Sequence, residues 1–139
     1  MKKLGDDARE IIYRVNPEVT NEQLNPLFAS ARENYTDRDF TPVHRNSLCY
    51  VCAFHADRLV GYVNLAWDGA SHGFILDTTV HKDYRHQGIG SHLVKQAVEY
   101  AREKKLDWVH VDFEAHLHGF YFEHCGFRPT DAGLIRVKN

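Results

Sequence analysis

The segment Val80-His81-Lys82-Asp83-Tyr84-Arg85-His86-Gln87-Gly88-Ile89-Gly90-Ser91 decides the fold of this chain. The run before it, residues 74–79, is apolar and β-branched and predicts a strand. Apolar residues then recur at helical spacing, at positions 89, 93, 94, 97, 98 and 101, and predict a helix over residues 89–104. The quoted segment is therefore the loop that joins a strand to a helix.

Two glycines, Gly88 and Gly90, stand where this helix should begin. They let a ligand approach the backbone closely, and the first N–H groups of a helix have no partner within it and attract anions. A phosphate is the ligand that suits such a corner. The corner is not a P-loop, because Ser91-His92 follows Gly90, and it is not a dinucleotide fingerprint, because Leu93 replaces the third glycine.

The longer pattern Ile75-x-Asp77-x-x-Val80-x-x-x-Tyr84-Arg85-x-x-Gly88-Ile89-Gly90 resembles the central motif of the GNAT family of N-acetyltransferases. The resemblance extends over the chain and is strongest over residues 74–127. It implies a mixed α/β (α+β) fold, with a mostly antiparallel central sheet, one splayed parallel strand pair and flanking helices. It also implies a single domain over residues 1–139.

The remaining patterns predict the element order β-α-(α)-β-β-β-α-β-α-β. Thr20 and Gln23 form a capping-box pattern at the start of the first helix. A helix connects the strands at 74–80 and 108–113, so these two strands should be parallel. The other strands are expected over residues 10–15, 48–54 and 59–67, with terminal pieces at 127–130 and 134–137. The helices are expected over residues 20–32, 89–104 and 117–124, with a short one between 33 and 47.

The family resemblance implies acetyl-CoA as cosubstrate and an amine as acceptor. We expect main-chain amides of the loop to bind the pyrophosphate, with charge added by flanking side chains. The pantetheine arm should pair with the main chain of the central strand. The residues expected to bind acetyl-CoA are Thr78, Val80, Arg85, His86, Gln87, Gly88, Ile89, Gly90 and Ser91.

The family reaction also implies an acid that protonates the leaving CoA thiolate. The usual acid is a tyrosine four residues before a Gly-Phe pair, which is Gly126-Phe127 here. Phe122 stands in that position, and Tyr121 is one residue away, about 100° around an ideal helix. Tyr121 can act as the acid if the helix is bulged or shifted; otherwise it is a packing or surface aromatic residue.

A base must take a proton from the amine, and Asp77 and Glu114 are the candidates, acting through water. Either one can instead be an ordinary polar residue at a strand end. Because Phe122 replaces the usual tyrosine, a second function stays open: an acyl-CoA sensor or regulatory domain with little turnover.

Composition excludes several other classes of protein. The 139 residues have a formal net charge of −2, which argues against a broad nucleic-acid footprint. No apolar run approaches the roughly 20 residues of a membrane span, and the first seven residues do not form a secretory signal. Three cysteines, Cys49, Cys52 and Cys125, make a disulfide framework unlikely on count alone. We expect a cytoplasmic protein without nucleic-acid or membrane partners, with a homodimer as an open alternative.

Two short motifs suggest metal binding at first sight. Cys49 and Cys52 lie three residues apart on a predicted strand, so they should face opposite sides and serve in packing. His116-x-His118 opens a predicted helix, where residues two apart do not share a face. We therefore expect no metal site.

Overall fold

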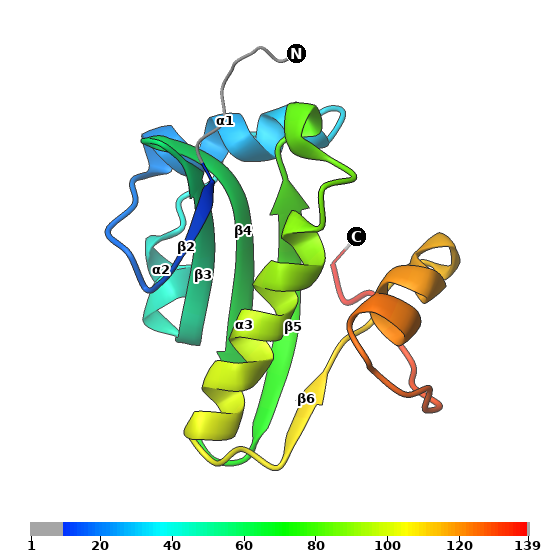
Figure 1. Ribbon diagram of the computed structural model, residues 1–139. Coiled ribbons are helices and arrows are strands. Elements are labelled where there is room, and N and C mark those ends of the chain that lie inside the picture. Colours follow the sequence, from blue (N-terminus) through cyan, green and yellow to red (C-terminus); the bar gives the residue numbers. More distant parts are fainter. Residues whose placement is uncertain (1–9, 139) are drawn as a thin grey trace.

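The computed structural model describes residues 10–138. They form a five-stranded sheet in the order β2-β3-β4-β5-β6 (Figure 1). The neighbours from β2 to β5 are antiparallel, and β5 and β6 are parallel. This confirms the mixed α/β fold and the single parallel pair. The strands are β2 (Ile11–Val15), β3 (Ser47–His55), β4 (Arg58–Trp67), β5 (His72–Val80) and β6 (Trp108–His110).

Three α-helices cover the sheet: α1 (Asn21–Ala31), α2 (Thr41–Arg45) and α3 (Ile89–Glu103). All three were expected from the sequence. The capping box fixes the start of α1, because the N–H of Gln23 donates to Thr20 Oγ1 at 3.2 Å and the N–H of Thr20 donates to Gln23 Oε1 at 2.9 Å. No helix within residues 10–138 has the length and apolar character needed to cross a membrane.

Two cores hold these layers together, one on each face of the sheet. α3 packs on one face, over residues such as Val51 and Val63, and α1 packs on the other, around Phe28 and Tyr62. Gly61 lets α3 approach β4, since a Cβ there would lie 2.9 Å from Leu93 Cδ1. Cys49 belongs to the first core and Cys52 to the second, as their spacing predicts.

The parallel pair separates soon after it forms. β5 and β6 pair only at His72–Trp108, Gly73–Val109 and Phe74–His110, and the chain then diverges from β5 (Figure 1). Beyond Phe74, therefore, β5 has no β6 residue opposite it. The expected strand at 108–113 ends at His110 for the same reason, although Val111 and Phe113 still pack against the first core.

The last part of the chain differs from the prediction. In place of an α-helix over 117–124 there is a 3-10 turn, η2 (Ala115–Leu117), and a π-helix, η3 (Gly119–His124). The expected strand pieces at 127–130 and 134–137 are absent, since residues 125–138 contain neither helix nor strand. Leu134, Ile135 and Val137 are 84–93% exposed. Strand-forming side chains do not make a strand without an edge to pair with.

Candidate functional site

The N-terminus of α3 has free main-chain donors. No side chain caps this helix; Ser91 Oγ instead donates to the carbonyl of Gly88 at 3.1 Å. The first helical bond runs from the N–H of His92 to the same carbonyl. The amides of Ile89 and Gly90, together with that of Ser91, precede this bond and have no acceptor within the helix. An external anion can therefore bind them.

The loop before α3 holds two residues in the left-handed region. His86 has a φ of 66° and Gly88 a φ of 81°. A Cβ on Gly88 would meet nothing within 4 Å, so its backbone conformation, not lack of space, favours glycine there. Gly90 is different, because a Cβ there would lie 3.2 Å from the ring of Phe120. The space that we expected to admit a ligand beside Gly90 is occupied on this side by η3.

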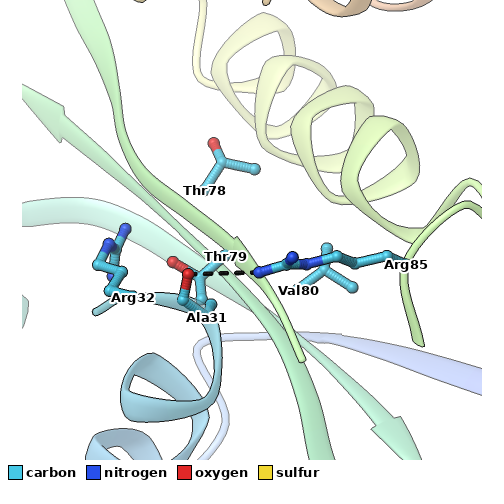
Figure 2. A pocket seen from close by; sticks show the side chains of 6 residues that line it. All are labelled: Ala31, Arg32, Thr78, Thr79, Val80 and Arg85. Atoms are coloured by element: carbon cyan, nitrogen blue, oxygen red, sulfur yellow. Dashed lines mark hydrogen bonds between the residues drawn. The ribbon is translucent and has the colours of Figure 1, made fainter. Parts of the chain in front are cut away.

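A pocket of about 210 Å³ lies beside the second half of β5 (Figure 2). Figure 2 shows Arg85 reaching from the loop to the end of α1, where its Nη2 donates to the carbonyl of Ala31 at 3.3 Å. Arg32 adds a second positive charge to the pocket. The lining combines these two cations with exposed main chain, and consists of Ala31, Arg32, Thr78, Thr79, Val80 and Arg85.

Tyr121 reaches β5 from η3. Its hydroxyl donates to Thr78 Oγ1 at 3.4 Å, and its side chain is buried. Burial raises the pKa of this phenol, and the hydrogen bond to Thr78 opposes that rise. Phe113 stacks on the ring at a centroid distance of 4.6 Å, while Phe122 packs against Phe113 and His118. The tyrosine, not the phenylalanine after it, is the residue that contacts the central strand.

Asp77 lies in a β-bulge of β5. Leu76 pairs with Asn64 and Thr79 with Tyr62, so two residues, Asp77 and Thr78, stand opposite a single residue of β4. Asp77 has a φ of 59°, and its Oδ2 lies 3.5 Å from Arg38 Nη2 in the loop between α1 and α2. The bulge thus directs Asp77 toward α1 and the next residue, Thr78, toward η3.

Glu114 lies apart from this group. It is exposed at the start of η2, where its carbonyl accepts the N–H of Leu117 at 2.9 Å. Within the described part of the chain its carboxylate forms no hydrogen bond or ion pair. The structure therefore places Tyr121 beside Thr78 and Asp77 beside Arg38, and leaves Glu114 exposed. It also adds Arg38, which sequence reasoning missed because nothing in its surroundings resembles a motif.

The described residues contain no cluster of three or more His, Cys, Asp and Glu side chains arranged to hold a metal ion. His72 Nδ1 and His110 Nε2 lie 2.7 Å apart across the parallel strands, but as a pair only. Burial raises the pKa of both Cys49 and Cys52 to about 12, so their thiols stay protonated and inert at neutral pH.

Residues 10–127 match the model of the acetyltransferase (GNAT) family. The chain belongs to the GNAT family. The matched region contains the α3 corner, the bulge of β5 and η3, which are the parts that form the site. The site residues therefore all lie within the region that matches the family.

Solved structures of other acetyltransferases share this GNAT fold. A GNAT family acetyltransferase from Streptococcus pneumoniae is 26% identical, with a TM-score of 0.74 over 93% of this chain and 100% of the other. An acetyltransferase from Trypanosoma brucei is 22% identical, with a TM-score of 0.73 over 94% and 100%. Glucosamine-6-phosphate N-acetyltransferase from Arabidopsis thaliana is 13% identical, with a TM-score of 0.71 over 92% and 99%. No curated protein sequence matches the chain significantly.

Proposed function

We propose that this GNAT protein transfers the acetyl group of acetyl-CoA to a primary amine. The observation that carries the proposal is the hydroxyl of Tyr121 beside Thr78, at the point where β5 has lost its β6 partner. An unpaired strand edge can hold an extended arm, and a buried hydroxyl at the same point can protonate a leaving group. The name of the Arabidopsis neighbour supports the proposal in one respect: the same fold carries N-acetylation there.

The binding half of the proposal rests on backbone groups. The free amides at Ile89, Gly90 and Ser91 suit the pyrophosphate, with His86 and Gln87 in the adjoining loop. Arg85, whose guanidinium is held within residues 10–138 by a single 3.3 Å bond to the carbonyl of Ala31, can turn to the phosphates. The main chain of Thr78 and Val80 lies in the half of β5 that pairs with β4 but has no β6 partner. The pantetheine arm would pair with this open edge as an extra strand.

The chemical half assigns an acid and a base to the two sides of the bulge. An alkylamine has a pKa of about 10, so its ammonium must lose a proton before the nitrogen attacks the thioester carbon. We assign this proton to Asp77, directly or through water. The C–N bond forms, a main-chain N–H of β5 stabilises the oxyanion, and the C–S bond then breaks. Tyr121 gives its proton to the leaving thiolate, and the nitrogen, positively charged once the C–N bond has formed, gives its second proton through water to restore the tyrosine. Asp77 returns its proton to solvent. The raised pKa of Tyr121 keeps it protonated before the transfer.

A screen for amine-dependent release of CoA thiol, with mass spectrometry of the products, tests the proposal. We expect at least one primary amine to give thiol and an acetylated product in equal amounts. A matched sample without amine measures the background hydrolysis. Saturable binding of acetyl-CoA with no amine-dependent thiol release across a broad panel would favour the sensor function instead, and absence of acetyl-CoA binding would exclude both functions.

A further inference from the structure

The loop between α1 and α2 is clamped at Arg38 by a buried amide. Asn25 is only 8% exposed, and it bonds both main-chain groups of Arg38. Asn25 Nδ2 donates to the carbonyl of Arg38 at 3.0 Å, and the N–H of Arg38 donates to Asn25 Oδ1 at 2.9 Å. The hydroxyl of Tyr35 donates to the same oxygen at 2.5 Å. The backbone of Arg38 is therefore fixed, unlike that of an ordinary surface arginine.

The side chain of Arg38 is held as well. Its guanidinium carbon lies 4.7 Å from the ring centroid of Phe40 and 5.7 Å from that of Phe28, within the range of a cation–π contact. These two rings are fully buried, so they provide a rigid support. Together with the clamp, they direct the guanidinium to the bulge of β5, where Asp77 lies.

The contact between Arg38 and Asp77 is loose and accessible. The N···O distance of 3.5 Å exceeds the roughly 2.7–2.9 Å of a strong charge-assisted bond. The side chains are 38% and 30% exposed, and no second carboxylate within residues 10–138 pairs with Arg38. A guanidinium has five N–H donors in a planar fork that fits a carboxylate. Most of these donors are free to bind a ligand.

We propose that the acceptor is a small zwitterion that carries a carboxylate next to its amine, as a free amino acid does. Asp77 binds the ammonium group and Arg38 binds the carboxylate. The proposal rests on the proposed acetyl transfer and names its substrate class. The adjacent positive and negative side chains present charges opposite to those of such a molecule. Arg32, whose guanidinium carbon lies 4.4 Å from the ring centroid of Phe28, adds positive charge on the same side.

The proposed acceptor also suits the direction of the reaction. The ammonium gives one proton to Asp77, and the neutral nitrogen then forms the C–N bond as the C–S bond breaks. The nitrogen loses its second proton through water, which replaces the proton that Tyr121 gives to the thiolate. The acceptor's carboxylate keeps its contact with Arg38 and takes no part in bond changes. The product is an N-acetylated acid, which has lost the positive charge that Asp77 binds and should therefore leave more readily.

A matched series of acceptors tests this inference. Each proteinogenic amino acid is compared with its amide and with the amine that lacks the carboxyl group, by amine-dependent CoA release. For the best acceptor we expect kcat/KM for the acid to exceed that for the amide and the amine roughly ten- to a hundredfold, as one charge-assisted contact allows. Equal values across the three would overturn the inference while leaving acetyl transfer intact. No release with this series, while another primary amine of the broad panel is acetylated, would likewise overturn the inference alone, and no release with any amine of either set would overturn acetyl transfer itself.

Two variants separate recognition of the carboxylate from a merely structural ion pair. Arg38→Gln should reduce the preference for the acid to about one, with acetyl-CoA affinity unchanged. Asp77→Asn breaks the same ion pair and suits the left-handed backbone, yet it should lower kcat while the preference for the acid persists. If both variants changed the preference equally, the recognition role of Arg38 would be excluded. Arg14→Gln, on the exposed far strand β2, is the charge-matched control.

Discussion

The hydroxyl of Tyr121 lies 3.4 Å from Thr78 Oγ1, although the family pattern places the acid one residue later, at Phe122. The wide turns of η3 explain the difference. The N–H of Cys125 donates to the carbonyl of Phe120, five residues back, and the N–H of Phe127 donates to the carbonyl of Tyr121, six residues back. The first of these bonds is a π-turn, which inserts one residue relative to an α-helix and rotates Tyr121 to the strand. The second closes the helix at Gly126, whose φ is 81°.

Because η3 is a π-helix, Tyr121 and Phe122 face different neighbours. Tyr121→Phe should lower kcat about a hundredfold, because general acids typically contribute at least that much, and should leave acetyl-CoA affinity unchanged. The double variant Tyr121→Phe with Phe122→Tyr should be equally slow, since position 122 packs on Phe113 and His118. Steady-state kinetics at several pH values measure both. Recovery of activity in the double variant would show that the acid can act from position 122.

A substitution of Gly88 should act through the backbone conformation alone. At a φ of 81°, Gly88→Ala should destabilise the fold by about 1–2 kcal/mol and weaken acetyl-CoA binding as the loop shifts. Gly69→Ala is a matched control, because Gly69 has a φ of 85° and equally open surroundings. Chemical denaturation should show similar losses for the two variants, and calorimetric titration should show weaker binding for Gly88→Ala only. Equal affinities would separate Gly88 from the binding corner.

A substitution of Gly90 should act through the volume of the added side chain. The Cβ of Gly90→Ala would meet the Phe120 ring at 3.2 Å, and the displaced ring would move η3 and with it Tyr121. We expect a loss of about 1 kcal/mol or more in stability and a lower kcat. Phe120→Leu removes the ring, so Gly90→Ala should lower kcat less in the Phe120→Leu background than in the wild type. Additive losses, measured by denaturation and kinetics, would contradict this coupling.

His44 should make stability depend on pH. Its Nε2 lies 2.9 Å from the hydroxyl of Tyr62, and burial lowers its pKa from the model-peptide value of 6.5. The unfolded chain therefore binds a proton at His44 more readily than the folded one. The contribution of neutral His44 to the free energy of unfolding is complete above about pH 6.5 and falls as the pH is lowered. Between pH 7.5 and pH 5, the melting temperature should fall less steeply in His44→Gln than in the wild type. The exposed His116→Gln should keep the wild-type slope.

Much of the fold could be predicted because local patterns and packing agree. The largely apolar runs of β3 and β4, the capping box of α1 and the apolar face of α3 specify these elements, and the structure has all of them. The glycine at position 88 and the helix after it also predict, from sequence alone, the corner at which we propose that phosphate binds. These features depend on neighbours within a few residues.

Other features depend on distant contacts, and the sequence conceals them. Helical periodicity cannot reveal a π-turn, which here accompanies the packing of Phe120 and Tyr121 against Gly90 and Phe113. The role of Arg38 follows from a clamp by Asn25, thirteen residues away. The tail after residue 127 has strand-like composition, but its final state depends on a pairing edge that is not encoded locally.

The bulge at Asp77 gives β5 a feature that a regular strand lacks: two residues stand opposite one residue of β4, and the first of them takes a positive φ. In the proposed reaction the first of these residues receives the amine's proton and the second contacts the acid. Removing a single residue there would restore regular pairing, with Leu76 and Thr79 keeping their β4 partners, and would leave one side chain where Asp77 and Thr78 now stand. Shortening the strand by one position should therefore be far more damaging than most substitutions within it. Length at this point, more than side-chain identity, is what natural variation would have to preserve.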